Sequence, residues 1–115
     1  MKHVAFFGDG EKTFALTDPM AKELEQKAGI GIGALYQRLM SAHFYLADLT
    51  ETIRLGLIGA GTSPADAQRL VETYATDRPV MEIVPLALDI VEARWSGTAL
   101  ADEGQDDAEQ DTADV

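Results

Sequence analysis

The feature that most restricts the fold is a segment near the C-terminal end that is apolar on several sides of a helix. Between residues 80 and 91 the charged breaks are Glu82 and Asp89. The apolar positions are Val80, Met81, Ile83, Val84, Leu86, Ala87, Leu88, Ile90 and Val91. Such a helix is either central and surrounded by the rest of the chain, or it completes the core with one side and offers the other to a partner.

The N-terminus predicts a β-hairpin. Two short apolar runs flank Gly8–Glu11, in which Asp-Gly tolerates the positive φ values of a tight turn. The expected register pairs Phe7 with Lys12, Ala5 with Phe14, and His3 with Leu16. One face then carries Ala5, Phe7, Phe14 and Leu16, and the other carries Val4, Phe6 and Ala15.

Five helices are predicted after the hairpin, from residues that start and stop helices. The first has Asp18 as N-cap and Pro19 at its first position, and it ends at Gly29. The others are expected from about 33 to 42, from a cap at Asp48 to Gly59, from a cap at Ser63, and from Pro79 to about Trp95, before Gly97. Pro85 predicts a kink in the last helix or marks its true beginning. The predicted fold class is α+β and mostly helical, an N-terminal β-hairpin followed by about five α-helices packed as a small bundle.

Charge divides the chain into two parts. The sequence has 9 Lys+Arg and 20 Asp+Glu, for a net charge of −11. Residues 98–115 hold seven of the acids, no base and no aromatic residue. Because such a segment cannot bury enough apolar surface to offset its ordering entropy, we expect a disordered acidic tail after a single domain of residues 1–97. This tail either keeps the protein soluble or repels wrong partners.

Several functional classes are disfavoured. The acidic balance argues against nucleic acid and against anionic membrane surfaces. The absence of cysteine removes thiolate metal sites and thiol catalysis. The two histidines, His3 and His43, have no metal-binding spacing, and the glycine runs do not follow a strand as a phosphate loop requires. With no signal peptide and no apolar run of about 20 residues, we expect a cytoplasmic protein that has no catalytic residue, metal or cofactor.

A string in the middle of the chain resembles a known family. Glu51–Gly61 has the sequence ETIRLGLIGAG, and it follows a Gly-Asp-Gly hairpin with the strand residues Phe14–Leu16. It precedes Ser63–Val71 (SPADAQRLV), and then Arg78-Pro79 with the apolar helix. Over about residues 3–97 the chain resembles the gene transfer agent tail protein family, which is grouped with phage tail tube proteins and tail assembly chaperones.

The resemblance implies a role in building the tail of a phage-like particle, with no catalytic residue to carry over. We favour a chaperone that binds the helical tape-measure protein, since a tube subunit usually needs a larger sheet. The alternative is a structural component, a tail tube or minor tail protein retained in the particle. A regulator of transcription or of a toxin is a third class. The candidate partner-binding residues are Val80, Met81, Ile83, Val84, Leu86, Leu88 and Ile90.

The expected partner is thus the tape-measure protein or another tail protein, and neither nucleic acid nor a membrane. Self-association into a homo-oligomer is left open. The expected location is the cytoplasm of the bacterial host or producer cell, or the particle itself.

Overall fold

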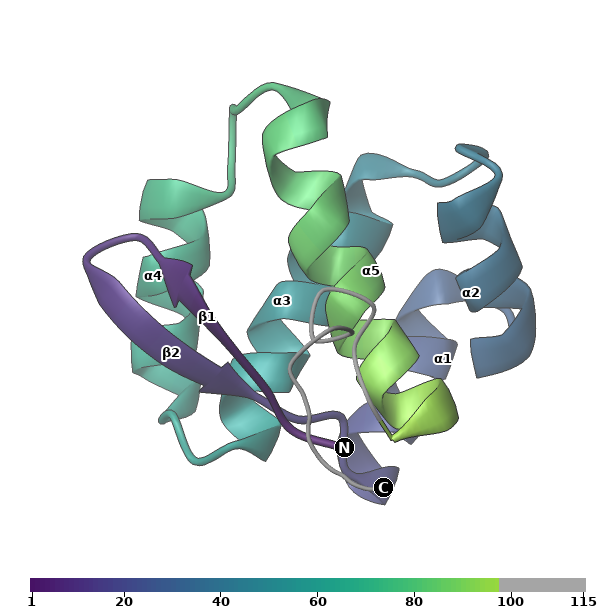
Figure 1. Ribbon diagram of the computed structural model, residues 1–115, viewed down its shortest axis with the longest axis horizontal. Coiled ribbons are helices and arrows are strands. Elements are labelled where there is room, and N and C mark those ends of the chain that lie inside the picture. The colour runs from purple at the N-terminus through teal and green to yellow at the C-terminus, as the bar shows by residue number, and fades with distance from the viewer. Residues whose placement is uncertain (98–115) are drawn as a thin grey trace, which may run out of the picture.

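A two-stranded antiparallel hairpin and five helices form the described part of the chain, residues 1–97, in the computed structural model (Figure 1). The elements are β1 (His3–Phe7), β2 (Gly10–Phe14), α1 (Asp18–Ala28), α2 (Ile32–Met40), α3 (Leu46–Gly59), α4 (Pro64–Tyr74) and α5 (Val80–Ser96). The predicted fold class is confirmed. The predicted disordered tail, residues 98–115, lies outside the described residues.

The hairpin register differs from the predicted one by two residues. The pairs are His3–Phe14, Val4–Thr13, Ala5–Lys12, Phe6–Glu11 and Phe7–Gly10. The turn is Gly8-Asp9 rather than Asp9-Gly10, and Gly8 takes a φ of 70°, as glycine does at the first position of a type II′ turn. A shift by two residues preserves the alternation of side chains. Phe7 and Phe14 therefore remain on one face, which is buried, and Phe6 lies on the other face, where it is exposed.

Two helices begin earlier than predicted. In α1 the N-cap is Thr17, and Asp18 is the first helical residue. In α3 the N-cap is Tyr45, while Asp48 lies in the first turn. The Asp48 Oδ2 accepts a hydrogen bond from the Tyr45 backbone N–H at 2.8 Å. A carboxylate at this position accepts a hydrogen bond from the backbone N–H of the N-cap, so it stabilises the helix start from within the first turn. The predicted N-cap at Asp48 was therefore wrong.

The other helix ends follow the sequence signals more closely. Ser63 caps α4, because its Oγ accepts a hydrogen bond from the Asp66 N–H at 3.2 Å. Gly29 and Gly97 end α1 and α5 in the left-handed conformation, as predicted. The second helix stops at Met40, two residues early. The helix α5 starts at Val80 and continues through Pro85, so the alternative that it begins at Pro85 is wrong.

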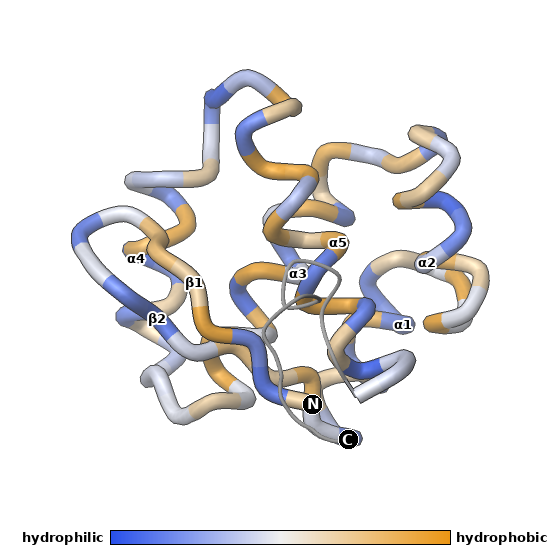
Figure 2. Tube along the Cα trace, viewed as in Figure 1, coloured by the Kyte–Doolittle hydropathy of each residue, from blue (hydrophilic) through white to orange (hydrophobic). Residues whose placement is uncertain are grey.

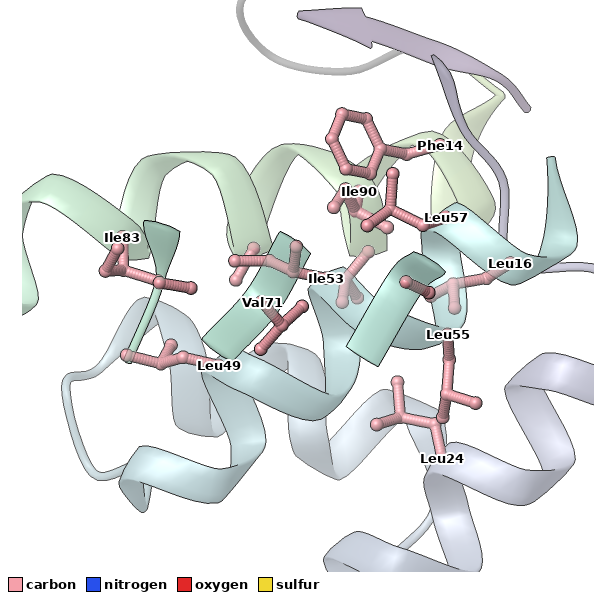
Figure 3. Close-up of a cluster of buried hydrophobic side chains, with 14 of the residues drawn as sticks. Phe14, Leu16, Leu24, Leu49, Ile53, Leu55, Leu57, Val71, Ile83 and Ile90 are labelled. Carbon is pink, nitrogen blue, oxygen red and sulfur yellow. The ribbon is translucent and has the colours of Figure 1, made fainter. Parts of the chain in front are cut away.

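The centre of the fold is α3 rather than α5. The helices α1, α4 and α5 and the strand β2 all pack against α3. Its fully buried apolar side chains are those of Leu49, Ile53, Leu55 and Leu57. They meet side chains from the other elements, such as Leu24, Val71 and Ile90 (Figure 3). The interpretation of α5 as a helix surrounded by the other four is therefore wrong, because α5 packs against α2, α3 and β1 and leaves Val80, Met81 and Pro85 exposed.

The string Glu51–Gly61 lies in α3 and its C-terminal end, and it contains most of the buried residues of that helix. The Arg54 Nη2 lies 2.7 Å from the Glu51 Oε1, and it also lies 3.7 Å from the Glu23 carboxylate of α1. At Gly59 an added Cβ would lie 1.9 Å from the Ala15 carbonyl oxygen. Only glycine allows the end of the hairpin to approach α3 this closely.

Candidate protein-binding surface

The seven candidate residues of α5 are divided between the core and the surface. Ile83 and Ile90 are buried. Three others are half-buried, namely Val84, Leu86 and Leu88. Val80 and Met81 are exposed, and Met81 retains 87 % of its accessible surface. The structure therefore leaves the N-terminal end of α5 uncovered, while the middle of the helix completes the core.

An apolar groove lies beside this end of α5. It has a volume of about 380 Å³ and separates the first half of α5 from the end of α2 and the connection to α3. All nine lining residues are apolar, and they include Leu39, Met40, Phe44, Met81, Val84 and Leu88. In Figure 1 the α2–α3 connection lies near the upper end of α5. This first groove can accept an apolar side chain and offers no charged partner along its walls.

A second groove lies on the other side of the first turn of α5. It has a volume of about 460 Å³ and is bounded by the start of α3 and the α4–α5 connection. Val80 lines both grooves. The second groove is also lined by Asp77 and Arg78, which have opposite charges. The exposed first turn of α5 thus stands between two hollows.

Large exposed apolar side chains gather around these grooves. We define the α5 N-terminal surface as Met40, Phe44, Tyr45, Leu46, Val80, Met81, Val84 and Leu88. It includes five of the nine large hydrophobic residues that are exposed within residues 1–97. Exposed apolar clusters of this kind are typical of sites that contact another molecule, so we take this surface as the candidate binding surface. Hydropathy along the trace shows that apolar segments of α3 and α5 also fill the middle of the fold (Figure 2).

Sequence reasoning missed the half of this surface that lies outside α5. Met40 ends α2, and Tyr45 and Leu46 begin α3. Their exposed fractions are 56 %, 70 % and 67 %. The signal in the sequence is the apolar run Phe44–Leu46, which by itself predicts a short connection between two helices. Its proximity to α5 depends on tertiary packing.

An ion pair holds the α2–α3 connection in place. The Arg38 Nη2 lies 3.0 Å from the Oδ1 of Asp48, whose side chain is buried. The same nitrogen donates a hydrogen bond to the Ala28 carbonyl oxygen at 3.2 Å. The guanidinium also lies 5.2 Å from the centre of the Tyr45 ring, within the range of a cation–π contact. These contacts fix the position of the α2–α3 connection, and a surface that is already ordered costs less entropy to bind than a mobile one.

A second buried carboxylate ties α2 to the C-terminal half of α5. The Tyr36 hydroxyl donates a hydrogen bond to the Glu92 Oε1, and the Ser96 hydroxyl donates one to the Glu92 Oε2 at 2.6 Å. The Tyr36 ring stacks on Trp95, with 5.2 Å between ring centres. The hydrogen bond to the Glu92 carboxylate raises the pKa of Tyr36, because ionisation would remove the donated proton.

Replacing Tyr36 by phenylalanine is expected to lower the free energy of unfolding by about 1 kcal/mol, since the buried Glu92 carboxylate loses a donor. A raised pKa means that this stabilisation is complete below pH 10 and is lost as the pH rises through the folded-state pKa. Urea denaturation of both proteins from pH 7 to pH 11 measures the difference. Tyr45→Phe, at an exposed side chain, is the control and should change stability by less than about 0.5 kcal/mol. Equal stability of Tyr36→Phe and wild type at pH 7 would contradict the expectation.

Within residues 1–97, no group of three or more histidine or acidic side chains is placed to hold a metal ion. No helix in that part of the chain combines the length and hydropathy needed to cross a membrane.

Comparison with known proteins identifies the family. The model of the family described as phage tail tube protein, GTA-gp10, matches residues 1–97, which is the whole described part of the chain. No curated protein and no solved structure matches the chain. The match confirms the resemblance that rested on Glu51–Gly61 and the flanking motifs. The chain therefore belongs to the GTA-gp10 phage tail tube protein family, a family of gene transfer agent tail proteins.

Proposed function

We propose that this tail protein is an assembly chaperone that binds the helical tape-measure protein through the α5 N-terminal surface. The observation that carries the proposal is the exposure of Met81 at the first groove, next to Val80, which lines both grooves. An amphipathic helix binds a groove of this kind by inserting apolar side chains spaced three or four residues apart. The all-apolar walls of the first groove fit such side chains.

The charge of the chain supports the same role. A long helical client with exposed apolar faces tends to aggregate before it is enclosed in a tail. A chaperone that covers those faces must itself stay soluble, and a net charge of −11 favours solubility. Binding of this kind requires no catalytic group, and in this proposal it takes place in the cytoplasm of the producer cell.

Co-expression with the tape-measure protein of the same gene cluster tests the proposal. Wild-type chain is expected to raise the soluble fraction of the tape-measure protein and to co-purify with it. Met81→Asp is expected to abolish both effects while the circular dichroism spectrum stays unchanged, because Met81 is 87 % exposed in the free protein. Burying an unpaired carboxylate in the interface should weaken binding by roughly a hundredfold or more.

Val4→Asp is the matched control. It places the same charge at an exposed apolar residue on the outer face of the hairpin, and it is expected to bind as wild type does. The proposal fails if wild-type chain neither solubilises nor binds the tape-measure protein. It also fails if Met81→Asp binds as tightly as Val4→Asp.

The description of the family favours a second candidate, a tail tube subunit that stays in the particle. Its sheet would then have to grow by contact between copies, since the sheet within residues 1–97 has two strands. Quantitative mass spectrometry of purified particles separates the two functions. Many copies of the chain in each mature tail indicate a tube subunit, whereas its absence from mature tails indicates a chaperone.

A further inference from the structure

We propose that the first turn of α5, residues 80–84, opens and closes separately from the rest of the fold, with Pro85 as the hinge. In the closed state Val80 lines both grooves of the α5 N-terminal surface and stands between them. Opening moves Val80 away and joins the two grooves into one longer site. The inference goes beyond the proposed function, since it concerns the free protein and is tested without any client.

Pro85 weakens the link between this turn and the rest of α5. The helix continues through Pro85, which has no backbone N–H to donate to the Met81 carbonyl oxygen one turn earlier. The proline ring also crowds that carbonyl group. Proline inside a helix is a common cause of a local bend, because it removes a bond from the helical ladder. The first turn is therefore joined to the second by fewer hydrogen bonds than an ordinary turn.

The beginning of the turn is also weakly fixed. Its N-cap is Pro79, which provides no side-chain hydrogen bond. The Glu82 N–H donates to the Pro79 carbonyl oxygen at 3.0 Å, the three-residue spacing of the less stable 3₁₀ geometry. The helix α4, in contrast, begins with the side-chain cap that Ser63 provides to the Asp66 N–H. Neither end of the first turn of α5 has the bonds that usually hold a helix start.

Few side chains attach this turn to the core. Every residue from Thr76 to Glu82 is exposed, and Ile83 is the first buried residue after Ala75. Within the turn Ile83 is the buried side chain, whereas the later part of α5 buries Ala87, Ile90 and Val91. The turn and the α4–α5 connection lie at the top of the molecule in Figure 1. Because segments with few buried contacts open at the lowest free energy, the first turn opens before the rest of α5.

Thiol labelling tests the opening, since the sequence has no cysteine and one introduced thiol reports on one position. Ile83→Cys and Ile90→Cys place the thiol at buried positions in the first turn and in the later part of the helix. Under native conditions Ile83→Cys is expected to be labelled at least about tenfold faster, because position 90 becomes accessible only in a larger unfolding event. Adding Pro85→Ala to each variant should lower the ratio of the two rates by about tenfold, since alanine restores the missing N–H.

Pro64→Ala is the matched control. Pro64 is at the first position of α4, where a backbone N–H has no partner within the helix, so this change should leave the ratio unaltered. Hydrogen exchange of the wild-type chain gives a second measurement that needs no change in the core. The amides of Ile83 and Val84 are expected to exchange faster than those of Ile90 and Val91.

Equal labelling rates at positions 83 and 90 overturn the inference, and so does a ratio that Pro85→Ala leaves unchanged. If a cysteine variant fails to fold, equal exchange of the four amides in wild-type protein overturns it instead. A chain with a closed first turn that still solubilises the tape-measure protein refutes only the opening. A chain whose first turn opens but that has no effect on the tape-measure protein refutes only the chaperone.

Discussion

Replacing Gly59 by alanine is expected to lower the free energy of unfolding by about 3 kcal/mol, a large part of the roughly 5–15 kcal/mol of a typical domain. The added Cβ would lie 1.9 Å from the Ala15 carbonyl oxygen and 3.1 Å from the Ala15 carbonyl carbon. These atoms belong to the backbone, so they cannot move aside as a flexible side chain can. The residue after β2 would have to leave α3, which would strain the 2.9 Å hydrogen bond from the Ala15 N–H to the Gly56 carbonyl oxygen. Thermal and urea denaturation followed by circular dichroism measure the loss.

Gly33→Ala is the matched control for this substitution. Gly33 is also helical, and a Cβ there would meet the Trp95 ring at an ordinary distance of 3.5 Å. Alanine has the higher helix propensity, so this variant is expected to be more stable than wild type by up to about 1 kcal/mol. If the two variants had the same stability, the close approach of Ala15 to α3 would not be the reason for glycine at position 59.

Replacing Arg38 by leucine is expected to cost about 3 kcal/mol, because it leaves the buried Asp48 carboxylate without its ion-pair partner. The substitution also removes the hydrogen bond from Arg38 to the Ala28 carbonyl oxygen and the contact with the Tyr45 ring. Since these contacts hold the α2–α3 connection, the variant is further expected to bind the tape-measure protein more weakly. Urea denaturation measures the first effect, and co-purification measures the second.

Arg69→Leu removes a comparable charge from a pair that lies in solvent. Its Nη2 lies 3.7 Å from the Asp66 carboxylate, and both side chains are 61 % exposed. Exposed pairs of this kind contribute about 0–1 kcal/mol, so this variant should be nearly as stable as wild type. An Arg38→Leu protein no less stable than Arg69→Leu would show that burial of Asp48 does not make the first pair important.

The helix boundaries show how far local signals reach. Ser63 and Gly97 act within one turn of their own position, through a side-chain hydrogen bond and a left-handed backbone, and both were predicted correctly. Asp48 was misread because a carboxylate can stabilise a helix start from the first turn as well as from the cap. Such boundaries depend on which of two local hydrogen-bonding patterns forms, and the residue type alone does not decide between them.

The hairpin register depended on a distant residue. Both Gly8-Asp9 and Asp9-Gly10 are reasonable turns by sequence. In the structure a Cβ at Gly8 would lie 2.3 Å from the Tyr74 ring of α4, so the turn packs against a helix more than sixty residues away. No pattern within the hairpin encodes that contact.

The sequence by itself determined the class of fold, the division of the hairpin side chains between two faces, most helix ends and the family, because each of these depends on short-range spacing or on a contiguous string. Tertiary structure alone decided that α3 is central, and that Met40, Tyr45 and Leu46 join Val80 and Met81 in one exposed surface. The physical reason is that hydrophobicity identifies which side chains leave water. Only the packing of α2, α3 and α5 against one another decides which of them are left at the surface.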